Sequence, residues 1–92
     1  LMSDALESDE INWIPFSPKE EKFECAAKFR YRQPEQRVTV ERTGSGARVL
    51  FHSPQRAVTP GQYVVFYNEK ECLGGGVIER VYKRKDGILT PM

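Results

Sequence analysis

The residues best suited to chemistry lie in one stretch, residues 27–34, which reads Ala-Lys-Phe-Arg-Tyr-Arg-Gln-Pro. In an extended strand, alternate side chains share a face, so Lys28, Arg30 and Arg32 would form a row of cations about 6.6 Å apart. That spacing suits a phosphate backbone, and the planar guanidinium of arginine pairs well with phosphates and base edges. Tyr31 would stand beside a turn, where its ring could stack on an unpaired base or pack in the core. The stretch indicates a polyanion partner, with a solvated strand face as the alternative.

Charge is unevenly distributed along the chain, although the net charge is only +1. Residues 1–24 carry seven acidic and two basic side chains, whereas residues 25–67 carry seven basic and two acidic ones. A basic, arginine-rich centre favours an anionic partner such as a nucleic acid. The acidic first segment would repel RNA and is better suited to a protein surface or to solvent.

The other reactive residue types have structural interpretations. His52 is the single histidine and is expected to be an ordinary side chain at a strand end. Cys25 and Cys72 are expected to be buried packing thiols, because they form no CxxC motif and give no disulfide framework or four-ligand zinc site. Trp13 is expected to anchor the first strand. The basic run 83–85, followed by Asp-Gly, predicts a hairpin or tail that is solvated rather than bound to RNA.

The elements that must position these residues are strands. No window keeps a helical spacing of apolar residues, and six prolines and seven glycines interrupt the chain. Short alternating or β-branched runs separated by turn residues predict about six strands of a small antiparallel barrel or sandwich. Their expected ranges are Ala5–Trp13, Phe23–Arg32, Arg37–Arg42, Arg48–His52, Tyr63–Tyr67 and Val77–Tyr82. Three consecutive glycines, residues 74–76, predict a bulge or a sharp bend; without a following helix or Lys-Ser/Thr they are no phosphate-binding loop.

Length and composition point to a binding module. A chain of 92 residues fits one domain with a thin core and little room for an enclosed catalytic cavity. Residues 1–10 are not expected to be a secretory signal, the chain has no apolar run long enough for a membrane span, and the few cysteines favour a cytoplasmic origin. The start at Leu1 is interpreted as a position inside a longer chain. No nucleophile, base and orienting group occur together, which argues against an autonomous enzyme.

Three strings in the sequence closely resemble the C-terminal domain of the bacterial tRNA-specific 2-thiouridylases. They are Ala-Lys-Phe-Arg-Tyr-Arg-Gln-Pro at 27–34, Pro-Gln-Arg-Ala-Val-Thr-Pro-Gly-Gln at 54–62, and Val-Phe-Tyr-Asn-Glu-Lys-Glu-Cys-Leu-Gly-Gly-Gly-Val-Ile at 65–78. Their order and intervals match the family too, so the resemblance spans nearly the whole chain.

This resemblance implies a single all-β domain, residues 1–92, at the C-terminus of a larger enzyme. The family's domain resembles the second domain of elongation factor Tu, a six-stranded antiparallel Greek-key-like barrel. Residues 1–14 would be a leading strand or linker, residues 22–84 the barrel and residues 85–92 a tail.

The resemblance also implies the chemistry of the parent enzyme. That enzyme replaces the 2-oxygen of the wobble uridine of tRNA with sulfur, using ATP and Mg²⁺ to adenylate the base and two cysteines to relay a persulfide sulfur from a sulfur-relay protein. This sequence has neither the family's Ser-Gly-Gly-Val-Asp-Ser-type loop nor its catalytic cysteine motifs. No catalytic, metal or cofactor site is therefore expected here, and the fragment alone is expected to be inactive.

The family's tRNA contacts in this domain correspond to three residues of this sequence: Arg30, Tyr31 and Gln62. Weaker additions, expected to supply charge, are Lys28, Arg32 and Arg56. Because strict alternation would place Arg30 and Tyr31 on opposite faces, joint contact with RNA requires the strand to end or bulge there. The alternative is a structural barrel that packs against the parent's catalytic and middle domains and has little RNA affinity of its own.

Overall fold

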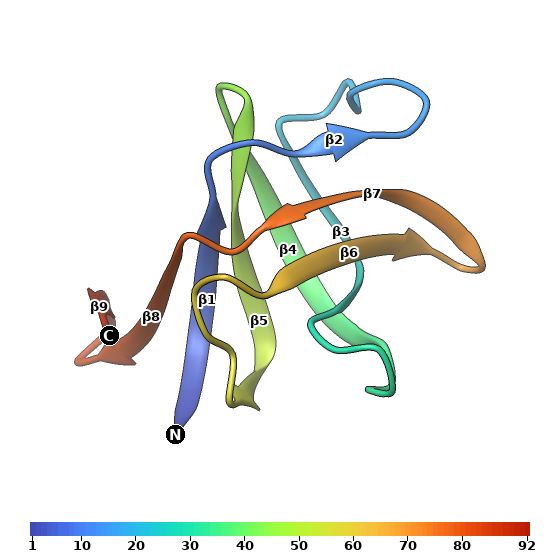
Figure 1. The fold of residues 1–92 in the computed structure, drawn as a ribbon. Coiled ribbons are helices and arrows are strands. Elements are labelled where there is room, and N and C mark those ends of the chain that lie inside the picture. Colours follow the sequence, from blue (N-terminus) through green and yellow to red (C-terminus); the bar gives the residue numbers. More distant parts are fainter.

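A computed structural model describes all residues 1–92 as nine strands and no helix (Figure 1). The strands are β1 (Met2–Ser8), β2 (Asn12–Trp13), β3 (Lys22–Lys28), β4 (Gln36–Thr43), β5 (Gly46–Arg56), β6 (Tyr63–Asn68), β7 (Glu71–Val77), β8 (Arg80–Lys85) and β9 (Ile88–Pro91). They form one sheet in the order β2-β7-β6-β3-β4-β5-β1-β8-β9. Every pairing is antiparallel, which confirms the predicted class. Since the structure contains no helix, it contains none that could span a membrane.

The strand count differs from the expected six, and the description as a barrel is only approximate. β2 and β9 end the sheet and do not pair with each other, so no ladder closes it. Two expected strands, 5–13 and 77–82, are each divided into two, because the chain changes the strand with which it pairs. At one division the amide of Ile78 donates to the carbonyl of Gln62 and the next amide, of Glu79, donates to that of Glu7. The chain thereby passes from the β6 side of the sheet to the β1 side.

Both ends of the chain belong to the sheet more fully than expected. β1 lies inside the sheet between β5 and β8, so the leading segment is a central strand. Residues 85–92, expected as a tail, contain β9, which pairs with β8 through a turn at Asp86 and Gly87, so the basic run 83–85 lies in a hairpin, the first of its two predicted forms. Both turn residues have positive φ (51° and 78°), as a two-residue hairpin turn requires.

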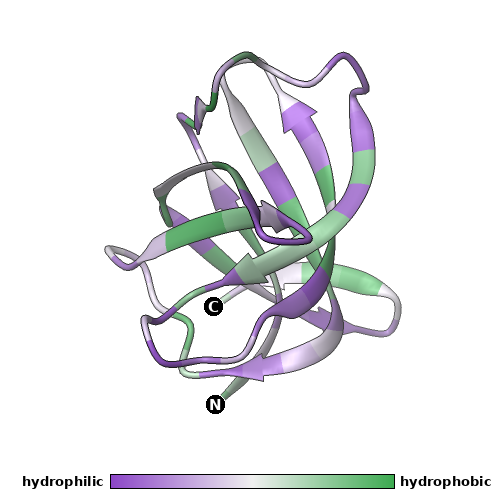
Figure 2. Cartoon of the chain, turned by 90° about the vertical axis from the view of Figure 1, so that its right-hand side faces the viewer, coloured by the Kyte–Doolittle hydropathy of each residue, from purple (hydrophilic) through white to green (hydrophobic).

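The core lies where β2, β7 and β6 cross over the steeply inclined β1, β5 and β4 (Figure 1). Strands in Figure 2 alternate between hydrophobic and hydrophilic residues, because each sheet face takes every second side chain. The larger residues with no exposed surface are Leu6, Val38, Val40, Val49, Val64, Phe66 and Ile78. Trp13 stacks on Phe66 with ring centroids 5.6 Å apart and meets Phe23 edge-on at 5.9 Å, so it anchors the first part of the chain as predicted.

The triple glycine marks a close backbone approach and a bulge, as predicted. Opposite it, the β6–β7 register shifts between Phe66, which pairs with Gly74, and Tyr67, which pairs with Cys72. Gly74 has φ +143°, and a Cβ built there would lie 2.3 Å from the carbonyl oxygen of Asn12. Only glycine lets β2 pair with β7 at this point.

The expected strand 23–32 is shorter than predicted, because β3 ends at Lys28. Phe29 is still buried, but a turn follows in which the amide of Gln33 donates to the carbonyl of Arg30 over 3.3 Å. The predicted row of three cations on one strand face therefore does not form. Pro34 follows this turn and has no backbone N–H to donate to a sheet ladder.

Candidate nucleic-acid interface

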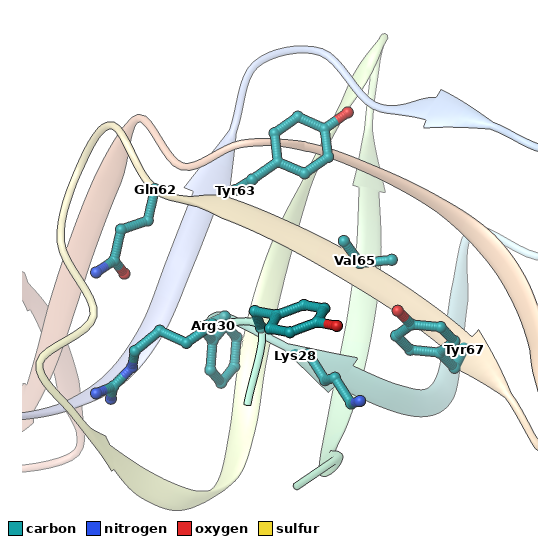
Figure 3. A pocket seen from close by; sticks show the side chains of 8 residues that line it. Lys28, Arg30, Gln62, Tyr63, Val65 and Tyr67 are labelled. Carbon is teal, nitrogen blue, oxygen red and sulfur yellow. The ribbon is translucent and has the colours of Figure 1, made fainter. Parts of the chain in front are cut away.

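The three residues singled out for RNA contact line one open groove of about 370 Å³. Arg30 and Tyr31 come from the turn after β3, and Gln62 immediately precedes β6. Lys28, Phe29, Tyr63, Val65 and Tyr67 complete the lining. Figure 3 shows Tyr63, Val65 and Tyr67 along β6 with Lys28 and Arg30 across from them. The lining contains two cations and no carboxylate, so its charge suits an anion.

Arg30 and Tyr31 reach the same groove because the strand has ended. The Arg30 guanidinium donates a hydrogen bond to the backbone carbonyl of Arg56, which ties the turn to the end of β5. Tyr31 is 91% exposed, so its ring is not a core residue. Of the two interpretations of Tyr31 from the sequence, the structure supports the solvent-facing one.

A chain of glutamine amides beneath this turn was not anticipated from the sequence. The amide of Phe29 donates to Gln33 Oε1 (2.9 Å), and Gln33 Nε2 donates to Gln55 Oε1 (3.0 Å). Gln55 Nε2 in turn donates to Gln36 Oε1 (3.1 Å) and to the carbonyl of Ser53 (3.0 Å). Gln55 is only 6% exposed, so these bonds satisfy a buried amide and fix the turn on the sheet. Two of these glutamines lie in the quoted strings, but sequence alone does not show that they meet.

Gln62 holds its own loop. Its Oε1 accepts from the amide of Thr59 (3.2 Å), and its Nε2 donates to the carbonyl of Ala57 (3.3 Å). The amide group therefore braces the loop before β6 while remaining at the groove, where Figure 3 shows Gln62 at the same end as Arg30. Each amide atom retains capacity for one further hydrogen bond.

Of the three residues expected to supply charge, one lines the groove and two lie outside it. Lys28 lines the groove, and its Nζ lies 5.7 Å from the centroid of the Tyr67 ring, a cation–π distance. Arg32 and Arg56 are exposed but do not line the groove. Arg56 contributes through its backbone carbonyl, which accepts from Arg30.

The aromatic side of the groove was also missed. Along β6, Val64 and Phe66 have no exposed surface, whereas Tyr63 is 52% exposed and Val65 and Tyr67 are partly buried. The run Tyr-Val-Val-Phe-Tyr at 63–67 predicts a strand, because its residues are β-branched and aromatic throughout. The same continuity means that nothing local shows which face of the strand points outward.

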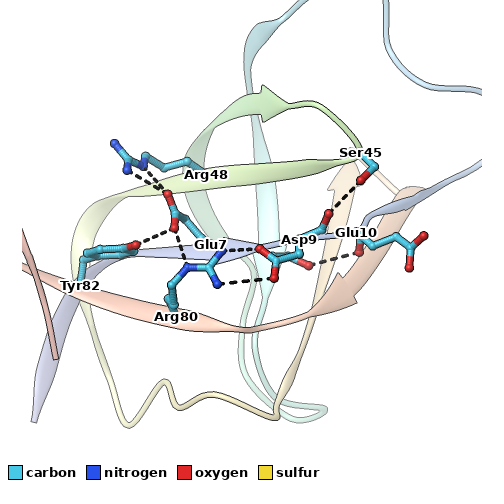
Figure 4. Close-up of polar contacts among 8 residues, drawn as sticks. Glu7, Asp9, Glu10, Ser45, Arg48, Arg80 and Tyr82 are labelled. Carbon is cyan, nitrogen blue, oxygen red and sulfur yellow. Dashed lines mark hydrogen bonds and ion pairs between the residues drawn. The ribbon is translucent and has the colours of Figure 1, made fainter.

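A separate polar cluster joins β1, β5 and β8 away from the groove (Figure 4). The Glu7 carboxylate accepts two hydrogen bonds from Arg48 (3.0 and 2.9 Å), one from Arg80 Nε (2.8 Å) and one from the Tyr82 hydroxyl (2.5 Å). Arg80 also forms an ion pair with Asp9. Acidic residues of the first segment thus neutralise arginines from elsewhere, and the charge separation along the sequence is partly cancelled in space.

Hydrogen bonding sets the protonation of this cluster. Burial alone would raise the pKa of Glu7, but the hydrogen bonds from Arg80, Tyr82 and Arg48 outweigh it and hold that pKa at about 2. The hydrogen bond that the Tyr82 hydroxyl donates to this carboxylate raises the pKa of Tyr82. Glu7 is therefore ionised at neutral pH. Its hydrogen bonds link β1 to β5 and β8, which is a structural role rather than that of an acid or base.

The remaining candidates have structural roles. His52 is exposed and its Nε2 lies 2.9 Å from Thr39 Oγ1, a contact between neighbouring strands. Cys25 is buried, and this burial raises its pKa to about 11. Cys72 is only partly buried, so the expectation of a buried thiol holds fully for Cys25 alone.

Comparison with known proteins agrees with the resemblance noted above. Over 83 residues, 90% of this chain, it is 58% identical to the tRNA-specific 2-thiouridylase MnmA of Streptococcus agalactiae serotype III (strain NEM316). It is 57% identical over the same length to a tRNA-specific 2-thiouridylase MnmA of Streptococcus pyogenes. The chain spans only 22% of the length of these relatives. The family model described as the aminomethyltransferase beta-barrel domain matches residues 3–78, and the chain therefore belongs to that family.

Proposed function

We propose that this domain binds tRNA through the groove lined by Arg30, Tyr31 and Gln62, as part of a longer tRNA 2-thiouridylase. The observation that carries the proposal is the convergence of these residues. Two of them lie in one sequence string and one in another, and they line one groove that holds two cations and no carboxylate. The matched relatives are named tRNA-specific 2-thiouridylases, which supplies the substrate class.

Each side chain has a role that suits RNA. Arg30 would bind a phosphate, because a guanidinium pairs with two phosphate oxygens at once. The exposed Tyr31 ring would contact a base or sugar, and Gln62 would use the remaining capacity of its amide for a hydrogen bond. Lys28 would add positive charge, with Arg32 and Arg56 contributing only at longer range.

The sulfur-transfer chemistry would lie in the rest of the longer protein. The groove offers no carboxylate for Mg²⁺ and no glycine-rich loop leading into a helix for the phosphates of ATP. We therefore assign ATP, Mg²⁺, the persulfide and the sulfur-relay partner no residues of this domain. A cytoplasmic location would follow from the tRNA substrate.

A tRNA titration of the 92-residue chain at two salt concentrations tests this proposal. We expect weak binding that falls steeply with salt, because phosphate contacts release counterions. Arg30→Ala should lower the affinity about tenfold, the scale of one charge-assisted hydrogen bond. Arg84→Ala, on the β8–β9 hairpin, removes the same charge far along the sheet and should have little effect. Absence of binding at low salt, or an equal loss in both variants, would contradict the proposal.

A second candidate function is docking onto the other domains of the longer protein. An apolar hollow of about 390 Å³ is lined by Leu1, residues 57–60, Val81 and Met92. Leu1 is 96% exposed and Met92 is 55% exposed. If the titration shows no RNA affinity, this apolar surface becomes the better account of the domain.

A further inference from the structure

We propose that the groove binds one unpaired nucleotide, with its base against the tyrosines of β6 and its phosphate on Arg30. This inference rests on the proposed RNA-binding function and names the part of the RNA that the groove takes. It adds two recognition residues, Tyr63 and Tyr67, to those expected from the sequence.

The outer face of β6 presents two aromatic rings and a smaller apolar side chain on which a base could pack. Tyr63, Val65 and Tyr67 alternate on this face, while Val64 and Phe66 between them are fully buried. The two tyrosines are four residues apart, about 13 Å along a strand, with the smaller valine between them. Figure 3 shows Val65 on β6 between Tyr63 and Tyr67, and all three side chains line the groove.

The Tyr63 ring packs against the backbone of the next strand. Tyr63 pairs with Val77, and its ring lies over Gly75, where an added Cβ would be only 2.8 Å from Cε2 of the ring. The absence of a side chain at Gly75 thus makes room for the ring. A ring positioned before binding loses little conformational freedom when a base stacks on it.

The cations occupy the opposite side of the same groove. Lys28 is the sheet partner of Val65, so its side chain shares the outer face, and its ammonium lies over the Tyr67 ring. Arg30 lies further along, next to Tyr31, which is 91% exposed. A nucleotide matches these two sides of the groove, because its base has flat apolar faces for the aromatic side and its phosphate is an anion for the cationic side.

A paired helix matches this groove less well. Bases in a duplex are stacked on one another, so a helix presents phosphates, sugars and base edges along its length but no free base face on which a tyrosine could stack. Unpaired bases in loops, by contrast, are commonly recognised by aromatic stacking beside basic side chains. The groove volume of about 370 Å³ is that of a small-molecule site.

The test compares two RNA probes on the full 92-residue chain. One probe is a 12-nucleotide single strand with 2-aminopurine at one position, and the other is the same strand annealed into a blunt duplex. We expect tighter binding of the single strand, and a change in 2-aminopurine fluorescence as the base stacks. Tyr63→Ala should lower the single-strand affinity about 5- to 100-fold, as loss of one base–aromatic stack does, whereas Tyr63→Phe should retain it.

Matched variants separate the possible outcomes. Phe16→Ala removes another exposed aromatic ring, on the loop after β2, and should leave binding unchanged. Tyr67→Ala provides a second test if Tyr63→Ala lowers the melting temperature. Equal affinity for single strand and duplex, or full single-strand affinity in both alanine variants while Arg30→Ala weakens it, would overturn this inference and leave the RNA-binding proposal intact. Failure of the unmodified chain to bind either probe or tRNA would overturn both.

Discussion

Gln33 Nε2 donates a hydrogen bond of 3.0 Å to Gln55 Oε1, and this contact joins the turn that carries Arg30 and Tyr31 to the end of β5. Gln55 is almost fully buried, so its amide depends on protein partners rather than water. The same turn is held a second time by the bond from Arg30 to the carbonyl of Arg56. The groove thus depends on a network of glutamine amides that lie outside its lining.

Replacing Gln55 with leucine should destabilise the domain and loosen the turn. The change removes the partner of Gln33 and Gln36 and should lower the free energy of unfolding by about 1–3 kcal/mol, the cost of unsatisfied buried polar groups. Urea denaturation measures the loss. Hydrogen exchange should also quicken at the amide of Phe29, which Gln33 caps. Gln36→Leu, which removes only the outer bonds of the network, should cost less. Equal stability in Gln55→Leu and the unmodified chain would contradict this account.

Stability should fall in acid because of Glu7. Its pKa is about 2 in the folded chain against an ordinary 4.5, so its contribution is complete above about pH 4.5 and is lost as the pH falls toward 2. Glu7→Gln should lower stability at pH 7 by about 1–2 kcal/mol and flatten the pH dependence in this window. Thermal melts between pH 2 and pH 7 measure both effects.

The control for Glu7 is Glu79→Gln, an exposed glutamate for which the structure shows no side-chain hydrogen bond or ion pair. It should keep the acid sensitivity of the unmodified chain. If Glu7→Gln kept the same sensitivity, the low pKa of Glu7 would not be the source of the acid effect.

The two thiols should differ sharply in reactivity. Burial raises the pKa of Cys25 to about 11, so it has almost no reactive thiolate at pH 8, whereas Cys72 is partly exposed. A thiol reagent should therefore label Cys72 quickly and Cys25 only as the chain unfolds. Cys72→Ser should abolish the fast phase, and full labelling of both thiols in urea provides the reference. A fast phase that survives in Cys72→Ser would show that Cys25 is accessible.

The predicted strands were correct where the local residue pattern sets them. They were wrong where a hydrogen-bonding partner distant in sequence sets the end of a strand. The run Tyr63–Tyr67 is a strand in the structure, as its β-branched and aromatic residues indicated. The divisions at Ile78 and around Ile11 were not predictable, because they occur where the amides turn to Gln62 and Ser45, residues distant in sequence. The early end of β3 was only hinted at by Pro34.

Sequence alone determined the strand class, the resemblance to a tRNA-modifying family and the candidates Arg30, Tyr31 and Gln62. Each of these depends on residue type and local order, which the chain carries directly. Only the tertiary structure decided that these candidates meet in one groove and that Tyr63 and Tyr67 form its wall. It also decided that Glu7 neutralises arginines 41 and 73 residues away. These features depend on which sheet face is outward and which strands are neighbours, and long-range pairing sets both.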